Sequence, residues 1–132
     1  MPTFKNAILN LSDSISAASQ SYEASGTFLT AGAAETYILK NIQIANTSQI
    51  VSASGYQVNV NVDLYDTSAG VTGSFIKLGV VPPFASLDVS SDNVVLEAND
   101  YIVVTLTGSN PLTGSADFTP SVSVVGSYLI ND

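Results

Sequence analysis

The sequence predicts an all-β protein, a single antiparallel β-sandwich of the jelly-roll or immunoglobulin-like kind with about eight strands. Short apolar segments are separated by turn-forming clusters at the spacing typical of such folds. Polar and apolar residues alternate within these segments, and no amphipathic helical pattern competes with them. The chain has 132 residues, of which 45% are hydrophobic and 11% charged, so it can bury a core and is unlike a disordered chain. We expect one domain over residues 1–132.

The N-terminal segments are predicted as two strands followed by a loop. Phe4–Leu11 is a short apolar segment before a polar turn. Within residues 1–12 it forms either the first strand or an arm that pairs with a neighbouring molecule. Ser14–Ala24 is ambiguous, because its alanines permit a helix, whereas its serines and its alternation favour a strand. We prefer the strand. Gly26–Glu35 is predicted as a loop.

Thr36–Ala45 is predicted as a strand whose isoleucines Ile38, Ile42 and Ile44 face the core. Lys40 falls on the same face, so we expect it where the strand extends beyond the core. A polar loop with a small apolar tip follows, over Asn46–Gly55.

The segment Tyr56–Asp66, YQVNVNVDLYD, alternates almost without a break and predicts a half-buried strand. Its apolar residues face inward, and its outward row is Gln57, Asn59, Asn61, Asp63 and Tyr65. This row is either a solvated face or a contact surface. Tyr65 stands out as a candidate contact for another subunit, because an aromatic ring ends an otherwise polar row. The cluster Asp66–Gly70 predicts a turn.

Five further strands are predicted in the second half of the chain: Ser74–Val81, Ser86–Val89, Val94–Leu96, Tyr101–Thr107 and Ser121–Ile130. Pro82-Pro83 must end the first of them, because proline cannot donate a hydrogen bond to a sheet. Tyr101–Thr107 is apolar on both faces, which predicts a central strand or one covered on its second face. Gly126 predicts a bend in the last strand.

The composition argues against most catalytic and nucleic-acid-binding chemistry. Without histidine, cysteine or arginine, neither a Ser-His-Asp or Cys-His site nor a histidine zinc site can be built. Three isolated lysines stand against 11 acidic residues, for a net charge of −8, so we expect no nucleic acid and no anionic membrane as a partner. The sequence has neither the pattern of a secretory signal nor an apolar run of about 20 residues, so we expect a protein made in the cytoplasm. We also expect no cofactor and no enzymatic activity.

Three weaker chemical interpretations remain open. Paired carboxylates could hydrolyse a glycoside, but Asp63 and Asp66 lie on opposite faces of their strand. Calcium could bind oxygen ligands at one end of the sandwich, from Asp88, Asp92, Asn93 and Asp100. The alternative, which we favour, is that these are turn residues bonded to the local backbone. The six tyrosines could form a sugar-stacking face, or be strand residues with half-buried rings.

The stretch Lys40–Gly108 carries a series of strand and turn motifs, KNIQIANTS, VNVNVDLYDTS, FIKLGVVPPFASLDVSS and NVVLEANDYIVVTLTGS. In these motifs it resembles small β-sandwich structural proteins of tailed bacteriophage virions, and the closing SVSVVGSYLIND resembles their C-terminal strands. One departure is Asn99, where the pattern commonly has glycine. Asparagine also tolerates the left-handed backbone conformation, so we expect the turn to survive.

The resemblance implies a non-enzymatic virion protein, in first place a capsid decoration (cement) protein that binds the outer head surface and stabilises the shell. It implies the major capsid protein, further copies of the chain, or both as partners, with a homo-trimer as the favoured assembly. The alternatives are a tail, neck or fibre component, or a carbohydrate-binding or adhesive module. Candidate partner contacts are Phe4, Ile8, Leu9, Ile50, Val51, Asn59, Asn61, Tyr65 and Phe84. Each apolar one could instead close an end of the core, and for Phe84 we favour that interpretation.

Overall fold

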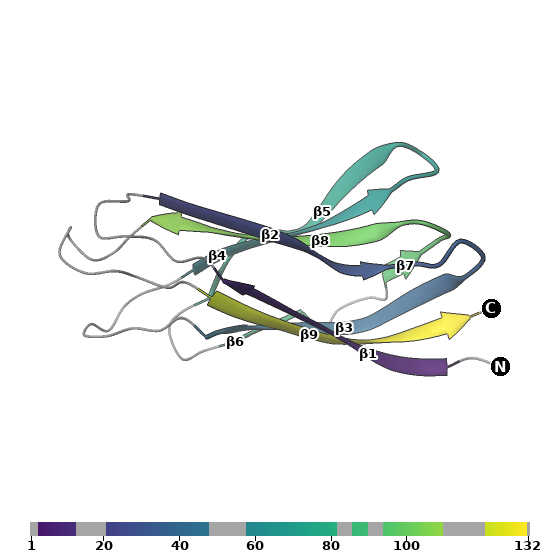
Figure 1. Cartoon of the computed structure of the whole chain (residues 1–132), viewed down its shortest axis with the longest axis horizontal. Coiled ribbons are helices and arrows are strands. Elements are labelled where there is room, and N and C mark those ends of the chain that lie inside the picture. Colours follow the sequence, from purple (N-terminus) through teal and green to yellow (C-terminus); the bar gives the residue numbers. More distant parts are fainter. Residues whose placement is uncertain are drawn as a thin grey trace.

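The computed structural model describes residues 3–12, 21–47, 58–81, 86–89, 94–109 and 121–131, and the regular structure in these ranges is all β-strand (Figure 1). The strands in chain order are β1 (Thr3–Ser12), β2 (Ser21–Thr30), β3 (Thr36–Asn46), β4 (Val58–Asp66), β5 (Val71–Val81), β6 (Ser86–Val89), β7 (Val94–Leu96), β8 (Tyr101–Ser109) and β9 (Ser121–Asn131). The predicted all-β class is confirmed.

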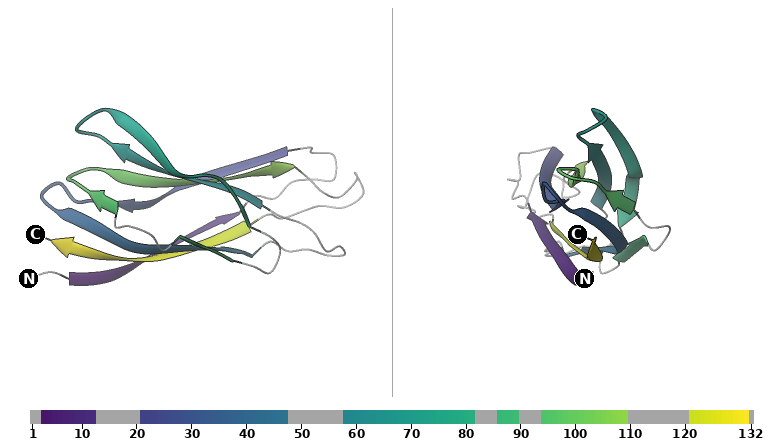
Figure 2. Two further views of the ribbon diagram at one scale, coloured as in Figure 1. Left: turned by 180° about the vertical axis from the view of Figure 1, so that it is seen from behind. Right: turned by 90° about the vertical axis from the view of Figure 1, so that its right-hand side faces the viewer.

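The strands form two antiparallel sheets that lie face to face (Figures 1 and 2). One sheet has the order β1-β9-β3-β6, with β7 also pairing β3, and the other has the order β2-β8-β4-β5. Because sequence neighbours such as β1 and β2 lie in different sheets, the chain crosses between the layers repeatedly. This is the β-sandwich that the alternating segments predict.

The core lies between the sheets and is built from the inward positions of each strand. β4 supplies Val58, Val60 and Val62, all fully buried, as the alternation of YQVNVNVDLYD predicts. β8 supplies a second set of fully buried side chains, Ile102, Val104 and Leu106. β8 pairs with β2 on one side and β4 on the other, so the predicted central position of this strand is confirmed. Each such side chain contributes roughly 1.5–3 kcal/mol on burial.

The prediction of a loop over Gly26–Glu35 is wrong in its first half, because β2 continues to Thr30. The register of β2 against β8 shifts between Thr27 and Leu29, and the consecutive residues Phe28 and Leu29 are both buried. Such a bulge places two neighbouring side chains on the same side and so breaks the period-two pattern. The loop itself is confined to the residues between β2 and β3.

A second bulge corrects the orientation predicted for β3. Its register against β9 shifts between Leu39 and Asn41, so Lys40 is the extra residue and is exposed. The bulge reverses which side chains face inward. Leu39 is buried and Ile38 is only half-buried before the bulge, whereas Ile42 and Ile44 are buried after it, as predicted. Lys40 is therefore exposed because of the bulge, and not, as predicted, because the strand extends beyond the core.

The strand predicted over Ser14–Ala24 overlaps β2 from Ser21 onward, and residues 14–20 lie outside the described residues. Most other boundaries follow the prediction closely. β6 and β7 have the predicted bounds, whereas β5 begins at Val71, three residues before the predicted Ser74. The predicted turn at Asp66–Gly70 is confirmed, since the Gly70 N–H donates to the Asp66 carbonyl (2.9 Å) and Gly70 has a φ of 69°. The loop tip with Ile50 and Val51, and the segment Pro82–Phe84, lie outside the described residues.

Candidate interaction surface

The outer face of the β1-β9-β3 sheet carries a row of apolar side chains that crosses four strands. The residues paired in register are Phe4 on β1, Leu129 on β9, Ile38 on β3 and Val95 on β7. Directly paired residues of an antiparallel sheet point to the same face, so these four side chains lie side by side. Phe4 is 70% and Val95 49% exposed. We call these four residues the apolar row.

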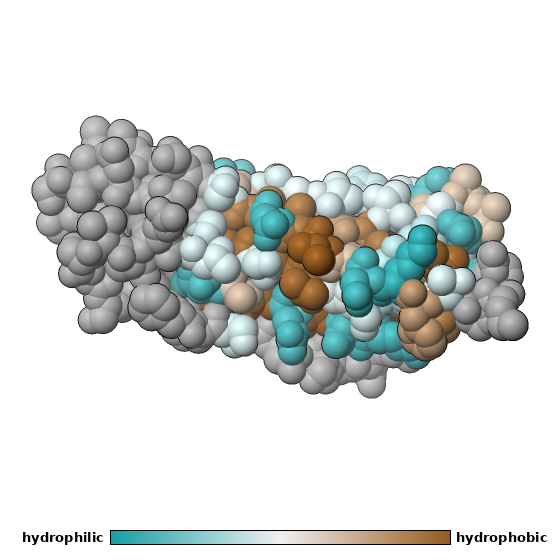
Figure 3. All heavy atoms as spheres, turned by 60° about the horizontal axis from the view of Figure 1, so that its bottom comes forward, coloured by the Kyte–Doolittle hydropathy of each residue, from teal (hydrophilic) through white to brown (hydrophobic). Residues whose placement is uncertain are grey.

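A second apolar pair lies further along the same face. Ile8 on β1 pairs with Val125 on β9, and the two are 65% and 41% exposed. Polar residues separate this pair from the apolar row: Asn41 accepts hydrogen bonds from the Ser127 N–H and hydroxyl, both at 2.9 Å. Figure 3 shows the resulting face, with brown patches in its middle and towards one end and teal side chains between them. We call the apolar row and this pair together the outer apolar face.

The outer apolar face is distinctive within this molecule. Of the six large hydrophobic residues exposed in the described ranges, four belong to it, and the other two, Val71 and Val80, are on β5. Contiguous exposed apolar surface on a folded domain is characteristic of contact with another macromolecule. Within the described surface, the outer apolar face therefore holds most of the large hydrophobic residues that are exposed, in two groups separated by polar residues.

The outer face of the other sheet is polar along β4, whereas its edge strand β5 exposes Val80, which pairs with Asn59, and Val71. Asn59, Asn61 and Asp63 are half-buried on β4, and they pair with Thr107, Thr105 and Val103 of β8. Asp63 accepts a hydrogen bond from the Ser74 hydroxyl on β5. These side chains have neighbours within their own sheet, an arrangement typical of a solvated face.

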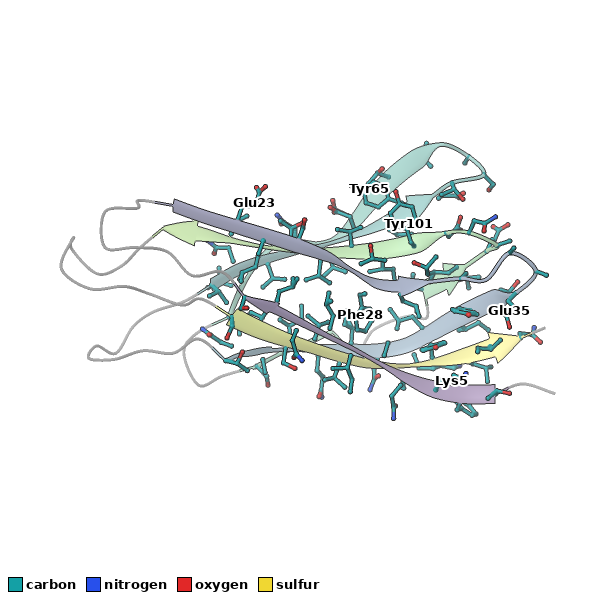
Figure 4. The ribbon with its side chains drawn as sticks, in the orientation of Figure 1. Lys5, Glu23, Phe28, Glu35, Tyr65 and Tyr101 are labelled. Atoms are coloured by element: carbon teal, nitrogen blue, oxygen red, sulfur yellow. The ribbon has the colours of Figure 1, made fainter. Side chains whose placement is uncertain are left out.

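Tyr65 also has a partner within its own sheet. Its ring stacks on that of Tyr101, with the ring centroids 4.8 Å apart and the planes at 3°, on the outer side of the β4–β8 pair (Figure 4). The contact fixes the orientation of both rings and uses one face of each. The prediction of Tyr65 as a subunit contact is not tested by this observation, but the position of its ring is explained without one.

The predicted contact residues thus fall into three groups. Phe4 and Ile8 are exposed on the outer apolar face, whereas Leu9 faces inward and packs against the core. The polar set, Asn59, Asn61 and Tyr65, lies on the opposite sheet. Ile50, Val51 and Phe84 lie outside the described residues.

Sequence reasoning missed four members of the outer apolar face, Ile38, Leu129, Val95 and Val125. Ile38 was predicted to face inward because the bulge at Lys40 is not visible in the alternation, and the other three lie next to further apolar residues, which obscures the direction of their side chains. The available signal was Val124-Val125 in SVSVVGSYLI, where the outward row of serines is interrupted by a valine.

At one end of the sandwich, a buried aspartate ties three turns together. Asp100 is 2% exposed, and its carboxylate accepts hydrogen bonds from the Thr67 N–H (3.1 Å), the Thr67 hydroxyl (3.3 Å) and the Glu97 N–H (3.0 Å). Its own carbonyl accepts from the Ala31 N–H at 2.9 Å. Asn99, beside it, has a φ of 69°, the left-handed conformation that the resemblance implies.

This bonding supports the structural interpretation of Asp100 over a role as a calcium ligand. Both carboxylate oxygens already accept from protein donors. Within the described residues, no three His, Cys, Asp or Glu side chains gather into a group that could hold a metal ion. Asp92 and Asn93 lie outside those residues.

Two titratable groups are perturbed by local contacts. Burial raises the pKa of Tyr37, and the hydrogen bond from its hydroxyl to the Glu35 carboxylate (3.1 Å) raises it further. The pKa of Asp66 is lowered, first by the hydrogen bond from the Ser68 hydroxyl (2.8 Å) and then by the Ala69 N–H (3.1 Å). Both contacts are local to their turns, so the shifts have structural causes.

The described ranges contain no helix with the length and apolar character needed to cross a membrane.

No family model and no curated protein sequence matches the chain. Solved structures are similar to it in fold. A chain in the structure of infectious bursal disease virus, Gx strain, aligns with a TM-score of 0.46 and 12% identity over 98% of this chain, which spans 37% of that one. A chain in the acid-stable capsid of Helicobacter pylori bacteriophage KHP30 has a TM-score of 0.41 and 10% identity, with 96% of this chain and 92% of that one covered. A chain of Mud crab tombus-like virus aligns with a TM-score of 0.44 and 14% identity, and the alignment covers 98% of this chain and 79% of that one. These similarities concern the arrangement of strands and assign no function.

Proposed function

We propose that this chain is a non-enzymatic structural protein of a tailed bacteriophage virion, and specifically a decoration protein that binds the outer surface of the head. The observation that carries the proposal is the outer apolar face. A chain with a net charge of −8 exposes Phe4, Ile8, Val95 and Val125 on one outer face, whereas the two large hydrophobic residues exposed in the other sheet both lie on its edge strand β5. The motifs between Lys40 and Gly108 support the phage class, because the same series recurs in such virion proteins.

The proposed mechanism is the repetition of a modest contact. The outer apolar face meets the capsid surface, and its burial contributes about 25 cal/mol for each Å² of apolar area removed from water. Copies bound on a symmetric shell engage many such contacts at once, so avidity multiplies a weak single interaction. The polar face of β4 and β8 then faces solvent, where the acidic residues keep neighbouring particles apart.

The test is binding to purified phage heads that lack the protein. We expect the chain to co-sediment with such heads and to raise their resistance to heat. Val95→Lys and Val125→Lys place charges in the outer apolar face, so each is expected to weaken binding at least about tenfold, or about 1.4 kcal/mol. Val71→Lys is the matched control, because Val71 is 58% exposed on β5, outside that face.

Binding to heads that is unaffected by either variant would overturn the assignment of the surface. Absence of binding to heads, with binding to purified tails, would overturn the head assignment and leave the chain a tail component.

A further inference from the structure

The two sheets present four edges, and an edge strand exposes backbone N–H and C=O groups that can pair with another chain. The edges are formed by β1, by β6 with β7, by β2 and by β5. Proteins usually protect such edges with short strands, bulges, charges or proline. The four edges differ in these features, and this difference distinguishes the β1 edge from the other three.

Three edges are protected. β6 and β7 have only four and three residues. β2 carries Glu23 and the register shift before Leu29. β5 has register shifts against β4, between Val60 and Val62 and between Val62 and Asp63. Each device interrupts the regular edge that strand addition needs.

Among the edge strands of the described residues, β1 differs in being both long and free of a register shift, although it carries one charge and follows Pro2 in the sequence. All ten of its residues, from Thr3 to Ser12, pair one to one with β9, from Ile130 to Ser121, without a register shift. It contains no proline, and Lys5 is its one charged residue. It also carries Phe4 and Ile8, the two most exposed large hydrophobic side chains in the described ranges. Within the described residues, β1 therefore offers the longest edge with an uninterrupted register.

We propose that the free edge of β1 pairs antiparallel with β1 of a second copy of this chain, about a two-fold axis. The proposal names a copy-to-copy contact and rests on the proposed role as a repeated structural protein. The distribution of acidic residues favours a second copy of this chain as the partner of the β1 edge. β1 and its neighbour β9 contain no acidic residue, so two chains of net charge −8 can approach there without opposed carboxylates. Two copies meeting through β2 would instead bring Glu23 towards the same residue of the second copy.

The pairing also continues the outer apolar face. In an antiparallel ladder only every second residue directs its N–H and C=O to the free edge, so a two-fold pairing must match even-numbered residues with even-numbered ones. Phe4, Asn6 and Ile8 of one copy then share a face with the same residues of the other. The two outer apolar faces become one surface, and the assembly is a dimer rather than the trimer that the resemblance implies.

The experiment measures self-association of the purified full chain without heads, by sedimentation velocity from about 1 to 200 μM, the range in which weak interfaces dissociate. We expect a monomer–dimer equilibrium. Asn6→Lys, placed beside Lys5, is expected to raise the dissociation constant at least about tenfold through like-charge repulsion. Val71→Lys is the control and is expected to leave the equilibrium unchanged, and thermal unfolding checks that each variant is folded.

A cysteine scan tests the geometry directly, because the chain contains no cysteine. Single variants Asn6→Cys, Ile8→Cys and Asn10→Cys, and a mixture of the first two, are oxidised and examined for covalent dimers. One pairing register should give efficient cross-linking, whereas Val71→Cys should give none.

A monomer at all concentrations with no cross-linking would overturn the pairing, even if the chain still binds heads. A dimer that forms through β1 but does not bind heads would overturn the proposed function and leave the pairing intact.

Discussion

The backbone carbonyl of Asn41 approaches Gly126 across the β3–β9 ladder so closely that a Cβ on Gly126 would lie 2.5 Å from that oxygen. The approach occurs beside the bulge at Lys40, where β3 is displaced relative to β9. A Cβ would also meet Phe28 Cζ at 3.0 Å. Glycine is therefore required here because another backbone comes close.

Gly126→Ala is accordingly expected to destabilise the fold by about 1–3 kcal/mol, the usual cost of adding a methyl group to a packed interior. Urea unfolding measures the change. Gly73→Ala is the matched control, because a Cβ at Gly73 would meet no atom within 4 Å. Equal effects at the two positions would contradict the explanation.

Asp100→Ala is expected to lower the free energy of unfolding by about 1–3 kcal/mol, because it removes the acceptor of two hydrogen bonds from the Thr67 turn and of one within its own turn. Glu97→Ala is the control, since it retains the backbone N–H that Asp100 binds. If calcium raises the melting temperature of the wild-type chain and not of Asp100→Ala, the structural role assigned to Asp100 would be wrong.

The lowered pKa of Asp66 predicts that the stability of the fold decreases at acidic pH. Its pKa is lowered in the folded state from an ordinary value of 3.8, so its contribution to stability is present above that value and is lost as the pH falls through the lower folded pKa. Asp66→Asn should flatten the acid limb of a plot of urea midpoint against pH. Ser68→Ala removes the largest cause and should return the pKa of Asp66 towards its ordinary value in an NMR titration. An unchanged acid limb in Asp66→Asn would count against this assignment.

The stacked pair Tyr65 and Tyr101 is expected to show a coupling free energy of about 0.5–1.5 kcal/mol in a double-mutant cycle with leucine at each position. Leucine retains apolar burial and removes the aromatic stacking. Chemical denaturation of the four proteins supplies the cycle. Additive effects would mean that the rings are merely adjacent.

The sequence predicts most of the fold because alternation is a local property. The inward row of β4, the central position of β8 and the turn at Asp66–Gly70 all follow from residue order alone. Both errors in the strands coincide with bulges, where Phe28-Leu29 and Lys40 depart from a period of two. A bulge depends on the partner strand, so no pattern in one segment reveals it.

The outer apolar face can be predicted from the sequence only in part, because it also depends on how separate strands pair. Phe4 and Ile8 are identifiable as unusual apolar residues in a short N-terminal segment. The rest of the outer apolar face exists only once β1, β9, β3 and β7 are in register, since Leu129 and Ile38 come from distant parts of the chain. The same register makes Leu9 an inward residue.

The pairing of β1 with β9 also bears on how the chain reaches its native state. Thr3 pairs with Ile130, so one ladder joins residues that a ribosome adds at widely separated times. β3 also cannot form its long ladder until β9 has been synthesised, because β9 is its partner in that ladder. The sheet with the outer apolar face therefore cannot close before β9 has been synthesised, and the long sequence separation of its paired residues predicts slow folding. Until β9 emerges, β1 has two free edges instead of one, and this interval is when the nascent chain most needs protection from aggregation.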